Sequence, residues 1–164
     1  MFHRLTESSR RTLFLARDQA PASHQSLIEP DHLLLGLIRL HPELFDEHLH
    51  LAILSVLEVK SAGSKQSATS SKAANLRFSD ELKRVLRNAN DEAASLYRRK
   101  TARRRRLLEF LTMNRWIVEP CHLLLGLLRE SDCTAAKSLI ELGVTLQTSR
   151  ERFSQSTCGT LDSL

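Results

Sequence analysis

Histidine recurs in one sequence context, at His32 and at His122. Imidazole is a common metal ligand and acid–base group, so two histidines in matching positions could form a metal centre or a catalytic pair. No further ligand residue follows either histidine after three or four positions, the spacing that places two ligands on one face of a helix. We therefore expect two buried structural histidines, each bonded to a neighbouring loop, and a protein without catalysis, metal or cofactor.

A second cluster that could do chemistry is basic. Seven of nine successive positions are cationic, and these are Arg98, Arg99, Lys100, Arg103, Arg104, Arg105 and Arg106. Such a run could bind the phosphates of nucleic acid or an acidic protein surface. On a helix, however, the run would spread around the cylinder, and no aromatic residues interleave with it to stack on bases. We expect a solvated, protruding helix face and keep an acidic protein partner and nucleic acid as alternatives.

The cysteines and the hydropathy pattern bear on the cellular compartment. Cys121, Cys133 and Cys158 are odd in number and show no CxxC spacing, which indicates reduced thiols rather than disulfides or a zinc site. Residues 1–20 carry charges throughout, and no stretch approaches the roughly 18 apolar residues that a membrane helix needs. We expect a cytoplasmic protein without a membrane segment.

Both histidines belong to a stretch that occurs twice. Residues 28–39 are IEPDHLLLGLIR, and residues 118–129 are VEPCHLLLGLLR. A repeat this close indicates two copies of one structural unit. Proline suits the first turn of a helix, and the apolar residues are too dense for a one-sided stripe, so we expect two buried helices, here called the leucine helices. Gly36 and Gly126 are predicted to lie where another helix crosses close to the backbone.

Each leucine helix is preceded by a predicted capped helix. Thr6 and Ser79 each follow an apolar residue and precede an acid, which is typical of an N-cap. The caps are 73 residues apart and the leucine stretches 90 apart, so the second unit holds seventeen extra residues. These extra residues include the basic run. We expect them either to extend the first helix of the unit or to add a helix of their own. A helix over 134–142 should end at Gly143, and a last short helix should run through Phe153.

The composition favours helices over strands. Aromatic residues make up 5% of the chain, and glycine and proline number only 5 and 4, so we predict an all-α fold. We divide the chain into a first unit (1–59), a flexible Ser/Ala/Lys-rich linker (60–75), a second unit with the basic insertion (76–153) and a disordered tail (154–164). Together they form one domain.

Several segments together are typical of one family: Leu5–Glu7, Arg10–Arg11, Asp31–Arg39, Phe78–Ser79, His122–Glu130 and Ala135–Val144. Through them the chain resembles the Clp N-terminal (double Clp repeat) domain family, the N-domain of Clp-type AAA+ unfoldases. The likeness covers about Phe2 to Phe153. It implies a compact bundle of two four-helix repeats related by pseudo-twofold symmetry, which in the family docks adaptors and substrates for an attached ATPase. The sequence contains no GxxxxGK[ST] motif, so we expect a stand-alone, non-enzymatic module.

The resemblance also implies a binding site. In some members, two matching pockets recognise phosphorylated arginine with the hydroxyl that caps each unit's first helix and an acid just before the leucine-helix histidine. By position, the first pocket would hold Thr6 and Asp31, and the second Ser79 and Cys121. Because a thiol cannot replace the carboxylate that grips the guanidinium, we expect phospho-guanidinium recognition in the first unit alone. The alternative is that Thr6 and Ser79 are ordinary caps and Asp31 is a first-turn acid.

The function implied by the resemblance is that of a protein-interaction module in Clp-linked proteolysis. Its partners would be a Clp unfoldase, an adaptor or client proteins. It would recognise clients, or compete with the N-domain of a full-length unfoldase. The alternative function is that of a basic helical protein that binds nucleic acid through Arg98–Arg106.

Overall fold

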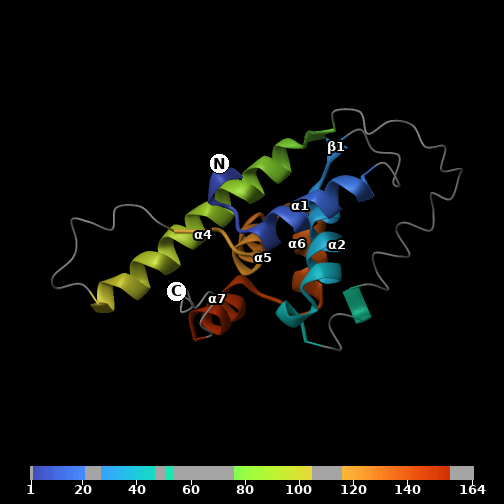
Figure 1. Cartoon of the computed structure of the whole chain (residues 1–164). Helices are drawn as coiled ribbons and strands as arrows, with labels where there is room; N and C mark the ends of the chain where they lie inside the picture. The colour runs from blue at the N-terminus through green and yellow to red at the C-terminus, as the bar shows by residue number, and fades with distance from the viewer. Residues whose placement is uncertain (1, 21–26, 47–50, 54–75, 105–115, 156–164) are drawn as a thin grey trace, which may run out of the picture.

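The computed structural model describes residues 2–20, 27–46, 51–53, 76–104 and 116–155. Helices dominate and the two strands have two residues each, so the predicted all-α fold is confirmed (Figure 1). In chain order the elements are η1 (Phe2–Arg4), α1 (Glu7–Gln19), β1 (Leu27–Ile28), α2 (Pro30–Leu40), η3 (Pro42–Leu44), β2 (Arg77–Phe78), α4 (Asp80–Arg104), α5 (Pro120–Arg129), α6 (Thr134–Glu141) and α7 (Leu146–Gln155). Residues 51–53 are also helical. None of the described helices is both long and apolar enough to cross a bilayer.

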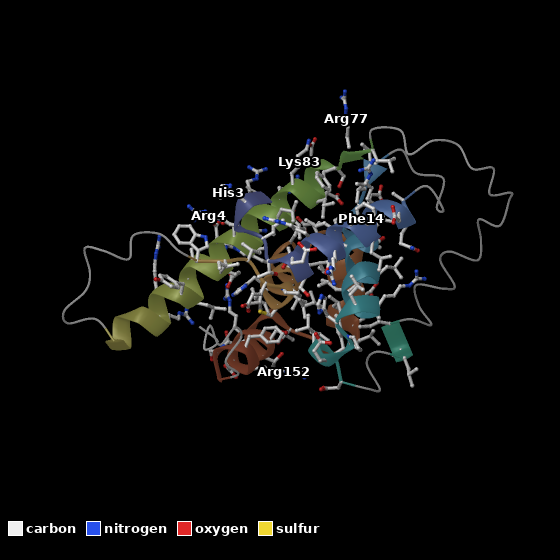
Figure 2. The ribbon with its side chains drawn as sticks, viewed as in Figure 1. His3, Arg4, Phe14, Arg77, Lys83 and Arg152 are labelled. Atoms are coloured by element: carbon white, nitrogen blue, oxygen red, sulfur yellow. The ribbon has the colours of Figure 1, made fainter. Side chains whose placement is uncertain are left out.

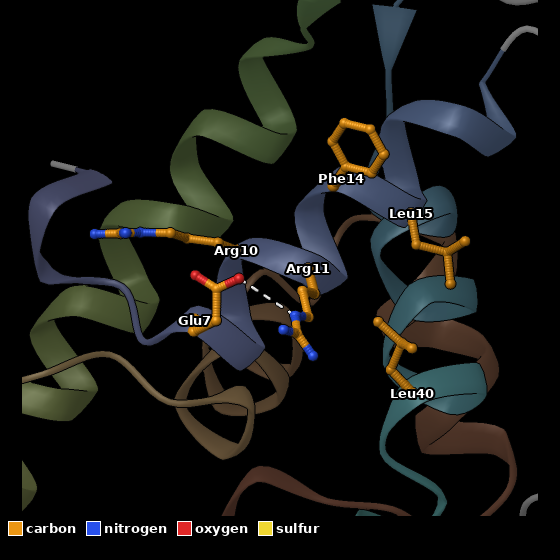
Figure 3. Close-up of a pocket in the computed structure, with 6 residues that line it drawn as sticks. All are labelled: Glu7, Arg10, Arg11, Phe14, Leu15 and Leu40. Atoms are coloured by element: carbon orange, nitrogen blue, oxygen red, sulfur yellow. Dashed lines mark hydrogen bonds and ion pairs between the residues drawn. The ribbon is translucent and has the colours of Figure 1, made fainter.

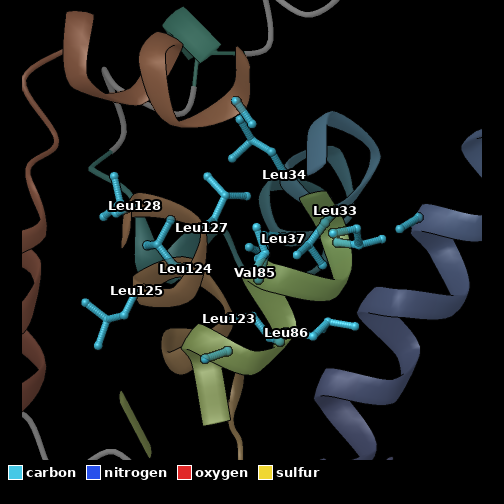
Figure 4. Close-up of a cluster of buried hydrophobic side chains, with 14 of the residues drawn as sticks. Leu33, Leu34, Leu37, Val85, Leu86, Leu123, Leu124, Leu125, Leu127 and Leu128 are labelled. Carbon is cyan, nitrogen blue, oxygen red and sulfur yellow. The ribbon is translucent and has the colours of Figure 1, made fainter. Parts of the chain in front are cut away.

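The two leucine helices, α2 and α5, form the centre of the core. Their fully buried leucines have exposed fractions of at most 1%, and these are Leu33, Leu34, Leu37, Leu123, Leu124, Leu125 and Leu127. Val85 and Leu86 of α4 pack into the same cluster (Figure 4). Burial of one such side chain stabilises the fold by about 1.5–3 kcal/mol relative to its exposed state. The dense apolar pattern of both repeats therefore has the buried role predicted for it.

The glycine of each leucine helix marks a close helix crossing. A Cβ atom on Gly36 would lie 2.7 Å from the carbonyl oxygen of Thr12 in α1, and one on Gly126 would lie 2.5 Å from that of Val85 in α4. Thr12 and Val85 each follow their N-cap by six residues, so the two crossings are equivalent. The prediction of packing glycines is confirmed in both units.

Short backbone pairings connect the units reciprocally. Strand β1 of the first unit pairs in parallel with β2 of the second, with Ile28 opposite Phe78. In the matching place, Leu5 of the first unit forms a parallel bridge with Val118 of the second. Each segment that leads into a capped helix is thus paired with the segment that leads into the other unit's leucine helix. This exchange is what a pseudo-twofold relation between two copies requires.

Part of the extra sequence of the second unit lengthens its first helix. Helix α4 has 25 residues against 13 in α1, and its far end extends beyond the bundle (Figure 1). Arg98 and Arg99 are exposed there, and Arg105 and Arg106 lie outside the described residues. Of the two possibilities predicted for the insertion, the structure shows an extended helix as far as Arg104.

The C-terminal helices follow the predicted pattern. Helix α6 ends at Glu141, and Gly143 adopts φ +85°, as expected for a C′ glycine. Helix α7 is tied to α4 by an ion pair between Arg150 and Glu92, whose side chain is only 4% exposed. The proposed linker (60–75) and residues 156–164 of the proposed tail lie outside the described residues, so the division into units stays a prediction.

Candidate functional site

The cap of α4 lies against the start of the first leucine helix. The Oγ atom of Ser79 accepts a hydrogen bond from the N–H of Leu82 at 3.1 Å, which is the N-cap interaction predicted from the sequence. The N–H of Ser79 donates to the carbonyl oxygen of Ile28 at 3.0 Å. Because Ile28 lies three residues before Asp31, this bond places the Ser79 cap beside the first turn of α2.

The cap of α1 has the equivalent arrangement with the second leucine helix. The Oγ1 atom of Thr6 accepts from the N–H of Ser9 at 3.2 Å, and the N–H of Thr6 donates to the carbonyl oxygen of Val118 at 3.1 Å. The hydroxyl of Ser9 donates to the same oxygen at 2.8 Å. Val118 precedes Cys121 by three residues, so the Thr6 cap lies beside the first turn of α5.

These bonds show that the predicted pairing of Thr6 with Asp31 is wrong. Helices α1 and α2 pack antiparallel, because Ser8 at the start of α1 lies 3.4 Å from the Nε2 atom of His41 just beyond the end of α2. Asp31 is at the other end of α2, and a helix of 11 residues is about 16 Å long. The Thr6 hydroxyl and the Asp31 carboxylate are therefore at opposite ends of this helix pair.

The predicted pairing of Ser79 with Cys121 is wrong for the same reason. The Nε atom of Arg84, in the second turn of α4, donates to Oε1 of Glu130 at the end of α5 at 2.6 Å. Cys121 is in the first turn of α5, at the opposite end. The structure instead brings Ser79 to the Asp31 end of α2, and Thr6 to the Cys121 end of α5. The sequence-based prediction placed each pocket within one unit. The residues near Ile28 and Val118 do not indicate which distant segment each of them pairs with.

Charges of both signs surround the Ser79 end of the site. Burial raises the pKa of the Cys133 thiol, and the negative charges of Asp31, Glu81 and Glu130 add to that effect. The Nζ atom of Lys83 lies 2.7 Å from Oδ1 of Asp80, and this hydrogen bond lowers the pKa of the Asp80 carboxyl.

Cations project from the surface beside this cap. Arg77 and Lys83 extend outward around the start of α4 (Figure 2), and both are exposed. A helix N-terminus with nearby cations favours an anion such as phosphate, and a carboxylate favours a guanidinium. The arrangement around Ser79 and Asp31 therefore suits a ligand that carries both groups.

The two repeated histidines stabilise the starts of their helices. His32 and His122 are buried, and the Nδ1 atom of each accepts the backbone N–H of the N-cap residue, Glu29 or Glu119, at 3.0 Å. An accepting Nδ1 is unprotonated, so the neutral ring carries its proton on Nε2. Burial lowers the pKa of His32, and the negative charge of Glu29 partly opposes the shift. The prediction that both histidines are buried is confirmed, but the Nδ1 bond of each is to the N-cap of its own helix and not to a neighbouring loop.

One cluster has the composition of a metal site. Ligand atoms of Glu119, Cys121 and His122 lie within 4.8 Å of one another, a grouping that the sequence analysis did not predict. It lies at the N-terminus of α5, where the helix dipole disfavours a cation, and the Nδ1 atom of His122 already accepts a backbone N–H. The Cys121 thiol donates to Oε2 of Glu119 at 3.8 Å. We assign the cluster to helix capping.

Comparisons with known proteins agree with this architecture. Residues 4–115 match the family described as the Clp repeat (R) N-terminal domain. The chain is 27% identical over 156 residues to the chaperone protein ClpB of Oceanobacillus iheyensis, and 28% identical over 156 residues to the negative regulator of genetic competence ClpC/MecB of Bacillus subtilis. Each match covers 94% of this chain, which spans 17% of the length of either relative.

A solved structure shares the fold. The crystal structure of the N-terminal domain of the caseinolytic protease associated chaperone ClpD from Arabidopsis thaliana superposes with a TM-score of 0.59 at 23% sequence identity. The match covers 92% of this chain and 95% of that one. At this identity the likeness shows the fold alone.

Proposed function

Because this chain belongs to the Clp repeat N-terminal domain family, we propose that it is a non-enzymatic protein-interaction module that docks adaptors or client proteins in Clp-linked proteolysis. Its partners would be a Clp unfoldase, an adaptor or the clients themselves. The fold supports this function because its described helices surround one apolar core and both repeated histidines cap the helices that contain them.

The observation that carries the proposal is the hydrogen bond from the Ser79 N–H to the carbonyl oxygen of Ile28 at 3.0 Å, three residues before Asp31. The N-terminus of α4 offers a partial positive charge to a phosphoryl group, and the Asp31 carboxylate offers a partner to the attached guanidinium. Phosphorylated arginine carries both groups on one side chain. The Thr6 cap lies beside Cys121, which lacks the carboxylate. We therefore assign phospho-guanidinium recognition to the junction of the two units, at Ser79 and Asp31.

Calorimetric titration of free phosphoarginine tests this assignment. Asp31→Ala should weaken binding at least about tenfold, since a charge-assisted hydrogen bond contributes roughly 1.5–3 kcal/mol. Ser79→Ala should also weaken binding, whereas Thr6→Ala and Cys121→Ala should not. Thr6→Ala is the matched control for Ser79→Ala, because each of these two substitutions removes one N-cap hydroxyl and costs about 1 kcal/mol of stability.

Two results would count against the assignment. If the wild-type protein does not bind phosphoarginine, the hydroxyls act only as helix caps. If Thr6→Ala weakens binding as much as Ser79→Ala, the ligand does not depend on the junction that contains Asp31. A pull-down from a cell extract tests the wider proposal, which fails if unfoldase and protease subunits are absent from the recovered material.

A further inference from the structure

A pocket of about 460 Å³ lies between α1 and α2 of the first unit. Its lining comes from one face of α1 and from the end of α2, and consists of Glu7, Arg10, Arg11, Phe14, Leu15 and Leu40. Leu15 and Leu40 approach each other across the space between the two helices (Figure 3). The side chains of Phe14 and Leu40 are 63% and 41% exposed, so a large part of this apolar surface faces solvent.

In the second unit, the positions equivalent to this pocket form a polar contact between α4 and the end of α5. Glu130 follows Arg129 at the end of α5, as Leu40 follows Arg39 at the end of α2. The carboxylate of Glu130 accepts from Nε of Arg84 at 2.6 Å and from Nδ2 of Asn88 at 3.3 Å. The two donors on α4 each bond to one oxygen of the carboxylate at the C-cap of α5, and the Glu130 side chain is only 14% exposed.

In the first unit the same positions have different chemistry. Arg11 matches Arg84, but Leu15 replaces the asparagine and Leu40 replaces the glutamate. Arg11 pairs with Glu7 of its own helix at 3.2 Å, and both side chains are about 70% exposed, at 72% and 68%. An exposed pair of this kind contributes little, typically below about 1 kcal/mol, so Arg11 can exchange Glu7 for another carboxylate at small cost.

We propose that the α1/α2 pocket docks an acidic, apolar segment of a partner protein. A carboxylate of that segment would pair with Arg11 as Glu130 pairs with Arg84, and Arg10 would add a second positive charge at the rim. A large apolar side chain next to the carboxylate would cover Leu15 and Leu40. Exposed apolar surface rimmed by charge is typical of interaction sites, and its burial provides most of the driving force.

This inference goes beyond the proposed phosphoarginine site. The pocket is at the Leu40 end of α2, whereas Asp31 is in the first turn of that helix. The two sites therefore depend on different residues. A negative result for one of the two sites would leave the proposal for the other unaffected.

The second unit suggests the decisive variant. Leu40→Glu gives the first unit the equivalent of Glu130. The new carboxylate should form an ion pair with Arg11 and so compete with the carboxylate of a partner. Ile140→Glu on α6 is the matched control, because it makes the same change of charge at an apolar residue of similar exposure, 45% against 41%. Arg11→Ala is a second test that removes the cation without filling the pocket. Melting temperatures of the three variants establish that each is folded.

The probe is a display library of random dodecapeptides, selected on the wild-type protein. We expect the enriched peptides to combine Asp or Glu with a neighbouring Leu, Ile or Phe. Measured by fluorescence anisotropy, they should bind at least about tenfold more weakly to Leu40→Glu and to Arg11→Ala, and with unchanged affinity to Ile140→Glu. Replacing the acid of the peptide by its amide should give a similar loss.

Other outcomes would overturn the proposal. These are the absence of enriched peptides, enrichment of peptides that lack acids, and equal binding to the wild type and Leu40→Glu. Sedimentation measurements test whether the pocket is occupied by a second copy of this chain. If the wild type forms dimers that Leu40→Glu abolishes, the pocket is a self-association surface and the acidic partner segment is refuted.

Discussion

The contact of α5 with α4 at Gly126 gives a sharp prediction for stability. In Gly126→Ala the new Cβ atom would lie 2.5 Å from the carbonyl oxygen of Val85, 2.6 Å from the backbone nitrogen of Ala89 and 2.7 Å from its Cβ atom. Two of these three atoms belong to the backbone, so no side-chain rotation relieves the overlap. The two helices must move apart, and the leucines between them lose contacts.

The size of the effect follows from two opposing contributions. Overpacking of a well-packed core costs about 1–3 kcal/mol, and we expect the upper end because the clash involves backbone. Alanine is more favourable than glycine inside a helix by about 1 kcal/mol. The net loss in free energy of unfolding should be about 2 kcal/mol, which corresponds to a fall in melting temperature of about 4–8 °C for a chain of this size.

Gly36→Ala provides the comparison within the same protein. Its Cβ atom would lie 2.7 Å from the carbonyl oxygen of Thr12, but the next contacts are 3.3 Å to Thr12 Cγ2 and 3.6 Å to the nitrogen of Ala16. We expect a net loss of about 1 kcal/mol or less. Urea unfolding followed by circular dichroism measures both values. A Gly126→Ala protein as stable as the wild type, or less affected than Gly36→Ala, would refute the close-crossing argument.

Three further predictions concern charge. Glu92→Gln should lower the free energy of unfolding by about 1–2 kcal/mol in urea titrations, because Arg150 loses its buried partner while staying partly solvated; an unchanged midpoint would contradict this. The lowered pKa of His32 means that the unfolded state binds a proton more readily, so stability should be full above pH 6.5 and fall as the pH drops below it. His32→Gln should lose less free energy of unfolding over that pH range, measured by urea titrations at several pH values. If the stability of the wild type and of His32→Gln falls equally with pH, His32 is not responsible. Finally, the protein should bind random DNA duplex weakly at any salt concentration. Tight binding that falls steeply with salt, and less steeply after Arg98→Ala and Arg99→Ala, would favour the nucleic-acid alternative.

Much of the fold was predictable from the sequence because its signals are local or repeated. The duplicated leucine stretch indicates two equivalent buried helices whatever their arrangement. A glycine within such a helix indicates a close crossing, and both Gly36 and Gly126 have one. Gly143 follows a short apolar helix and adopts the positive φ that favours glycine at a C-terminus. Each of these inferences needs only the residues within a few turns of the position concerned.

The composition of the candidate sites depended on tertiary structure. Ser79 meets the start of α2 through a bond to Ile28, 51 residues away in sequence, and local spacing carries no information about such a partner. The antiparallel packing of each capped helix on its own leucine helix then separates Thr6 from Asp31. The sequence alone determined two similar units, each with a hydroxyl cap. It also determined that the acid before the leucine-helix histidine is present in the first unit alone, as Asp31. Only the pairing of strands β1 and β2 between the units decided which cap lies at the Asp31 end of α2, because local sequence does not indicate strand partners that are so far apart.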